Sequence, residues 1–156
     1  MALDQTSKEG NILASIKKFL IDNLHSVAGY HMTFDKGLAV PKVQGHEVDR
    51  WISVQFGSME MSDTIATKHM EIIPCSRKDK EFYELSNMRD DIVGYLTDIG
   101  QPDGVRRIGL YNSTAQPWAQ VGSMVVHLDT ESEMMTANDG TKFKIIPFRL
   151  RWGAKI

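Results

Sequence analysis

Residues 50–73 read RWISVQFGSMEMSDTIATKHMEII, and this stretch decides the fold. Apolar and polar side chains alternate over residues 50–56 and again over residues 64–73, which is the two-residue period of a half-buried β-strand. Residues 57–63 contain glycine and serine and are expected to link the two strands. Pro74 has no amide donor, so we expect the second strand to end there.

Two helices are predicted on either side of this pair of strands. Apolar residues at helical spacing indicate one helix over residues 7–24, and residues 6–9 have the spacing of a capping box at its start. A second apolar stripe predicts a helix from Lys78 or Asp79 to Leu96. Each stripe covers one side of its helix, so each helix is expected to bury one face against the sheet.

Four more strands complete the predicted fold, at residues 30–34, 105–111, 119–128 and 142–152. The resulting order is helix, three strands, helix, three strands. Short links between consecutive strands favour antiparallel pairing, with both helices on one side of the sheet. We therefore expect an α+β fold: a mixed, mainly antiparallel sheet with two helices packed on one face, in a single domain over residues 1–156.

The composition excludes several classes of protein. With 42% hydrophobic and 24% charged residues, the chain of 156 residues has the make-up of a globular domain with one core. The net charge of −2 argues against tight nucleic-acid binding, which needs a basic face. A single cysteine excludes an intrachain disulfide and suits a reducing compartment. Because neither a signal peptide nor a long apolar run is visible, we expect no membrane association and assembly in a cytosol.

Motifs for catalysis or cofactor binding are missing from the sequence. The P-loop, GxGxxG and GxSxG patterns do not occur. Cys75 is close in sequence to Arg77 and Lys78, which would lower the pKa of an exposed thiol. The simpler interpretation is a small residue at a strand end, because an activated thiol also needs a base. We therefore predict that the protein is not an enzyme and has no cofactor.

Two histidine–carboxylate pairs raise an alternative. His69 and Glu71 share one face of a strand, and His127 and Asp129 have the same spacing. Two such pairs supply the ligand types of a divalent metal site, which would make the chain a small metal-binding enzyme. The competing interpretation is polar side chains on a solvent-facing or partner-facing side of the sheet. No HExxH or CxxC pattern supports a metal, so we predict no metal site.

The remaining feature of the sequence is a set of tryptophan and methionine residues in polar surroundings, where they could contact other protein chains. Exposed tryptophan and methionine are typical of protein interfaces. The alternative is that each side chain packs on the core, and it weighs most for Trp51, which lies on the more polar face of its strand. Residues 38–47 and 129–141 form longer loops than a compact domain requires, which suggests binding arms. The candidate interface residues are Trp118, Met134, Met135 and Trp51.

Several of these elements resemble a known family. They are the opening helix, Phe34-Asp35, Trp51-Ile52-Ser53-Val54, the helix from Phe82 to Leu96, and the closing strand IPFRLRW at residues 146–152. In these residues, and in the order of its elements along nearly the whole length, the chain is similar to the tail terminator, or tail-completion, proteins of long-tailed bacteriophages. That family has an α+β fold with helices on a mixed sheet.

The resemblance implies a structural role in the virion tail. Members of the family assemble in the host cytoplasm, typically as six-membered rings, on the end of the tail tube. They stop tube growth and present a surface to the head connector or neck protein. The implied partners are therefore further copies of this chain, the tail tube protein and the head connector. Another head–tail connector or tail tube protein remains the alternative within the virion.

Passage of phage DNA through the ring has a consequence for its lumen. DNA would only pass through the lumen, and basic side chains there would grip its phosphates, so an acidic or neutral lining is favoured. We expect Asp129, Glu131 and Glu133 to line the lumen.

Overall fold

The computed structural model describes residues 2–62, 64–79 and 81–155. Its main sheet has the strand order β1-β4-β5-β10-β7-β6. β1 runs parallel to β4, and the other neighbours pair antiparallel, which confirms the predicted mixed, mainly antiparallel sheet of an α+β fold. The strands are β1 (His31–Phe34), β4 (Arg50–Ser62), β5 (Ile65–Ser76), β6 (Arg106–Asn112), β7 (Ala119–Leu128) and β10 (Ile146–Gly153).

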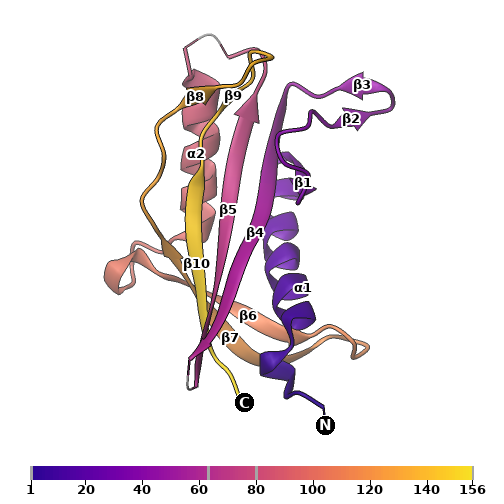
Figure 1. Ribbon diagram of the computed structural model, residues 1–156, viewed down its shortest axis with the longest axis vertical. Helices are drawn as coiled ribbons and strands as arrows, with labels where there is room; N and C mark the ends of the chain where they lie inside the picture. Colours follow the sequence, from indigo (N-terminus) through magenta and orange to yellow (C-terminus); the bar gives the residue numbers. More distant parts are fainter. Residues whose placement is uncertain (1, 63, 80, 156) are drawn as a thin grey trace.

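Two helices cover one face of this sheet, as the sequence predicts. α1 (Glu9–Leu20) continues into the π-helical turn η2 (Ile21–His25), and α2 is Tyr83–Leu96. In Figure 1, β4, β5 and β10 run along the long axis while β6 and β7 cross below, so the sheet curls around α1. None of the helices in the described ranges is long and apolar enough to cross a membrane.

One core lies between the helices and the sheet. Fully buried residues of α1, α2 and the strands belong to a single apolar cluster, which places both helices on the same side. Each such side chain stabilises the fold by about 1.5–3 kcal/mol relative to exposure. The cluster includes Ile12, Ile16, Leu20, Met88, Ile92, Leu96, Ile72, Phe148 and Leu150.

The two helix starts differ from the sequence prediction. The capping box at residues 6–9 does not form, because Lys8 takes the N-cap position without a side-chain hydrogen bond. Thr6 instead lies in the short helix η1 (Gln5–Ser7) and joins the chain ends: its carbonyl accepts from Trp152 Nε1 at 2.8 Å. α2 begins at Tyr83, later than predicted. The buried carboxylate of Asp79, which precedes the helix, accepts a hydrogen bond from the amide of Leu85 in its first turn at 2.8 Å.

The central strands are longer than predicted. Residues 57–62, expected to be part of a link, belong to β4, because a register shift between Phe56 and Met59 absorbs the irregularity. Pro74 lies inside β5 and does not end it. The partner strands explain this: β10 pairs with β5 up to Ile72, and β9 (Lys142–Phe143) pairs from Cys75, so Pro74 falls between the two.

Both predicted loops contain short strands. β2 (Lys42–Val43) and β3 (His46–Glu47) form a hairpin that projects from the body of the molecule (Figure 1). β8 (Met135–Thr136) pairs with β9 (Lys142–Phe143), which in turn extends the sheet beside β5. The predicted last strand is therefore divided into β9 and β10. A further short helix, η3, is Pro102–Gly104.

Candidate interface for assembly

Trp51 is not a surface anchor, so this part of the predicted interface is wrong. Its side chain is 0% exposed and packs with Ile73 and Cys75 on the sheet face opposite the helices. The alternation of polar and apolar residues in β4 predicts an exposed position for Trp51, but a second, smaller apolar core covers this part of the sheet face. The covering side chains come from the chain before β4 and from the β9 region: Leu38, Val40, Val48, Phe143 and Ile145.

Trp118 lies half-buried in the connection between β6 and β7. Its ring is tilted against that of Tyr111, with the ring centroids 6.5 Å apart. Tyr111 in turn folds over Gly109, where an added Cβ would lie 2.7 Å from the tyrosine ring. The two aromatic rings therefore form a partly exposed cluster at one end of this hairpin. An interface at Trp118 stays a prediction.

Met134 and Met135 are also half-buried. Met135 lies in β8 opposite Phe143, a residue that packs against the small core, and Met134 directly precedes this strand. Their role in an interface stays a prediction.

Two hairpin tips expose apolar side chains that the sequence reasoning missed. Val43 in the β2–β3 hairpin is 44% exposed, and Met61 and Ile65 at the end of the β4–β5 hairpin are 40% and 47% exposed. The tips lie near opposite ends of the long axis (Figure 1). At the second tip the apolar residues belong to the sequence MEMSDTI at residues 59–65. Because the sequence pattern predicts a link over residues 57–63, it does not predict an exposed apolar tip there.

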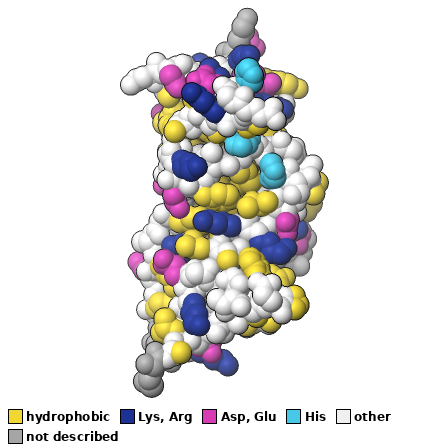
Figure 2. Space-filling view, turned by 90° about the vertical axis from the view of Figure 1, so that its right-hand side faces the viewer, with side chains coloured by type: hydrophobic (Ala, Val, Ile, Leu, Met, Phe, Trp, Pro, Cys, Tyr) yellow, Lys and Arg dark blue, Asp and Glu magenta, His cyan; other side chains and the backbone are white. Residues whose placement is uncertain are grey.

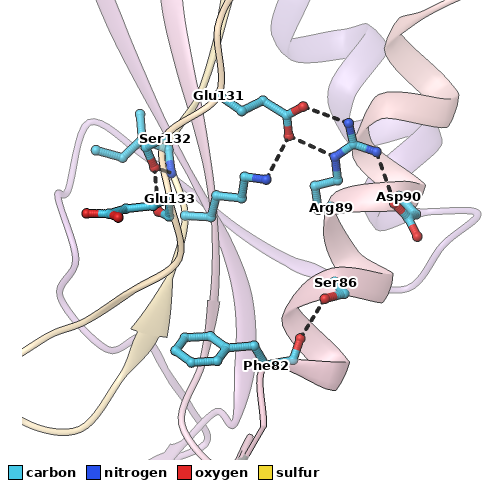
Figure 3. Close-up of polar contacts among 9 residues, drawn as sticks. Phe82, Ser86, Arg89, Asp90, Glu131, Ser132 and Glu133 are labelled. Carbon is cyan, nitrogen blue, oxygen red and sulfur yellow. Dashed lines mark hydrogen bonds and ion pairs between the residues drawn. The ribbon is translucent and has the colours of Figure 1, made fainter.

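Glu131 is held against α2 by two cations. Its carboxylate accepts two hydrogen bonds from Arg89, at 2.7 and 2.6 Å, and Lys144 Nζ lies 3.1 Å away. The hydrogen bonds from Arg89 chiefly, and the one from Lys144 in addition, lower the pKa of Glu131 to about 2. The same contact raises the pKa of Arg89. Figure 3 shows Glu131 pointing toward Arg89, while Glu133 points away from α2.

The three predicted lumen residues therefore differ in their surroundings. Asp129 accepts a hydrogen bond from Arg149 at 2.9 Å, so its charge is compensated like that of Glu131. Glu133 is exposed and forms no ion pair with the described residues. Lining of a lumen by these residues stays a prediction, with Glu133 the one that presents an uncompensated charge.

The two histidine–carboxylate pairs are separated by a strand. Arg149 of β10 lies opposite His69 of β5 on one side and opposite His127 of β7 on the other. Two strand spacings put the histidine backbones about 10 Å apart, with an arginine between them. Burial, and then the charges of Arg149 and Arg151, lower the pKa of His127. Among the described residues, no group of three or more His, Cys, Asp or Glu side chains could hold a metal ion.

Cys75 lacks the surroundings of a reactive thiol. It is fully buried, and burial chiefly, with the Asp139 charge in addition, raises its pKa to about 12. The neighbouring cation Arg77 pairs with Glu47 at 2.8 Å instead of activating the thiol. Because the thiolate is the reactive form, this site favours the structural interpretation of Cys75.

The fold is shared with solved structures of low sequence identity. One, whose title gives only a sequence identifier, has a TM-score of 0.62 and 7% identity, and the match covers 96% of this chain and 99% of that chain. A chain of the structure titled "Virion of native gene transfer agent (GTA) particle" has a TM-score of 0.60 and 13% identity, over 95% of this chain and 98% of that chain. Neither a family model nor a curated protein matches the sequence significantly. The chain therefore has the fold of a gene transfer agent virion component over nearly its whole length.

Proposed function

We propose that this chain is a structural virion protein that acts as a tail terminator. It assembles as a ring, typically of six copies, on the end of the tail tube, stops tube growth and joins the tail to the head connector. The observation that supports this best is the fold match to a gene transfer agent virion chain, because it covers 95% of this chain and 98% of that one. In this role the protein has no catalytic activity.

The two ends of the molecule expose different apolar side chains, which supports a protein that binds a different partner at each end. A closed ring needs a heterologous interface, in which one face of each copy meets a different face of the next. A ring that joins a tube to a connector also needs two unlike ends. Exposed apolar side chains at opposite ends of the long axis, Val43 at one and Met61 with Ile65 at the other, offer such contacts.

Electron microscopy of the purified chain tests this proposal. We expect negatively stained fields to show closed rings of uniform diameter, and we expect rings added to growing tail tubes to stop their elongation. Long tubes formed by the chain alone would contradict the terminator role and favour a tail tube protein. Particles that neither close into rings nor attach to tube ends would reject both roles.

A further inference from the structure

β1 is an edge strand, and the backbone N–H and C=O groups on its outer side have no hydrogen-bond partner among the described residues. Its Asp35 amide, just past the strand, donates to Val54 O of β4 at 2.7 Å. In a parallel pair, alternate residues face the neighbouring strand, so His31 and Thr33 share this orientation. The N–H and C=O groups of Met32 and Phe34 therefore point away from β4. No hydrogen bond from the described residues reaches them.

At the opposite edge of the sheet, formed by β6, side chains of α1 accept hydrogen bonds from backbone amides. At the end of β6, Ser15 Oγ of α1 accepts a hydrogen bond from the Tyr111 amide at 2.9 Å. Asn11 Oδ1, one turn earlier, accepts from the Ser113 amide at 3.0 Å. Helix side chains therefore satisfy one outward amide near the end of β6 and a second amide just past it, so that α1 covers this end of the edge strand. β1 has no such cover from the described residues.

A hollow of about 450 Å³ follows this open edge. β1 forms one wall, and the chain from Lys36 to Lys42 forms the other. Thr33 lies in the β1 wall with 8% of its surface exposed, and its hydroxyl has no hydrogen-bond partner among the described residues. Lys36 and Lys42 line the hollow and form no ion pair with the described residues. The site therefore combines unpaired backbone groups, an unpartnered hydroxyl and two positive charges.

The helix side of the same edge is apolar with a further cation. The Phe34 ring stacks on that of Phe56, with centroids 6.4 Å apart, and Lys17 Nζ lies 5.3 Å from the Phe34 centroid. Figure 2 views the side of the molecule on which α1 and β1 lie and shows hydrophobic side chains interleaved with Lys and Arg. A strand laid along β1 would send alternate side chains to this surface and into the hollow.

We propose that β1 is a docking edge for an extended segment of a partner protein, in which carboxylate side chains alternate with small apolar ones. The segment adds a strand to the sheet through the outward N–H and C=O groups of Met32 and Phe34. Its carboxylates meet Lys36 and Lys42, and its apolar residues meet the Phe34 surface. The docking edge does not depend on ring formation, because a monomer presents all of these groups.

The test uses a terminally blocked peptide, Thr-Glu-Val-Glu-Val-Glu-Thr, added to isotopically labelled full-length protein and followed by NMR. At about 1 mM peptide, we expect the Met32 and Phe34 amide protons to shift downfield as they become hydrogen-bonded, and the His31 and Thr33 amides to move less. A peptide with lysine in place of glutamate tests the charge. A peptide with proline in place of valine tests strand pairing. Both control peptides are expected to leave the spectrum unchanged.

Two variants separate the contributions. K36E/K42E should raise the dissociation constant at least about tenfold, whereas the matched charge reversal K155E, at the opposite end of the molecule, should leave it unchanged. Met32→Pro removes one outward donor and should abolish binding while the far-UV circular dichroism stays that of the wild type. Binding that is absent, that is equal for the lysine or proline peptide, or that K36E/K42E leaves unchanged would overturn the proposal.

Discussion

Replacement of Glu131 by glutamine is expected to lower the free energy of unfolding through one well-defined contact. The Glu131 side chain is 18% exposed and receives two hydrogen bonds from Arg89 and one contact from Lys144. Its pKa falls from 4.5 to about 2, which corresponds to about 3 kcal/mol of differential stabilisation of the carboxylate. Because Arg89 is 30% exposed, solvent screens part of this, and we expect E131Q to cost about 2 kcal/mol at pH 7.

The dependence on pH follows from the sign of the shift. A carboxylate whose folded pKa is lowered stabilises the protein above its unfolded pKa, and the stabilisation is lost as pH falls through the folded pKa. The window therefore runs from 4.5 down to about 2. By pH 3.5, roughly 40% of the difference between wild type and E131Q should have disappeared.

Urea unfolding at pH 7 and at pH 3.5 measures this effect, with E133Q as the matched control. Glu133 lies two residues away, is exposed and forms no ion pair with the described residues, so E133Q should stay within about 0.5 kcal/mol of wild type. Equal stabilities of E131Q and E133Q, or a difference that does not shrink on acidification, would refute the reasoning.

Three further predictions follow from single side chains. Trp51→Ala should cost about 3–5 kcal/mol in urea unfolding because the side chain is fully buried, whereas Trp118→Ala, at a half-buried site, should cost about 1 kcal/mol; similar costs would contradict the assigned burial. Cys75 should react with a thiol reagent in about 8 M urea, where the chain is unfolded, and should resist the reagent in the native state, because burial raises its pKa to about 12; rapid native labelling would contradict this. Asp79→Ala removes the acceptor of the Leu85 amide and should cost about 1–2 kcal/mol, while Asp79→Asn should retain most of the stability; a neutral alanine variant would show that the contact is unimportant.

Much of the fold could be predicted because its signals are periodic and local. The boundaries of β7 coincide with the predicted residues 119–128, and the stripes of α1 and α2 identify the residues of the main core. What failed depends on pairing that no local pattern records. Pro74 remains in β5 because its neighbours change from β10 to β9 at that point. Residues 59–62 pair with β5 because a bulge at residues 57 and 58 absorbs the irregular register.

The candidate site was harder to predict because exposure is a tertiary property. Trp51 occupies the polar phase of its strand, yet Leu38 and Val40 arrive from an earlier segment and bury it. The partner of Glu131 is Arg89, 42 positions away, so no spacing rule connects them. The open edge of β1 arises from the order of strands in the sheet, which the sequence does not encode locally.

The molar mass of the purified chain in solution tests ring assembly most directly. Light scattering after size exclusion, over a series of concentrations, gives this mass without assumptions about shape. We predict a species of about six times the 17.6 kDa chain mass, which Trp118→Ala or Met134→Ala shifts toward smaller species. A mass of one chain at every concentration, unchanged when tail tubes are added, would contradict assembly as the function of this protein.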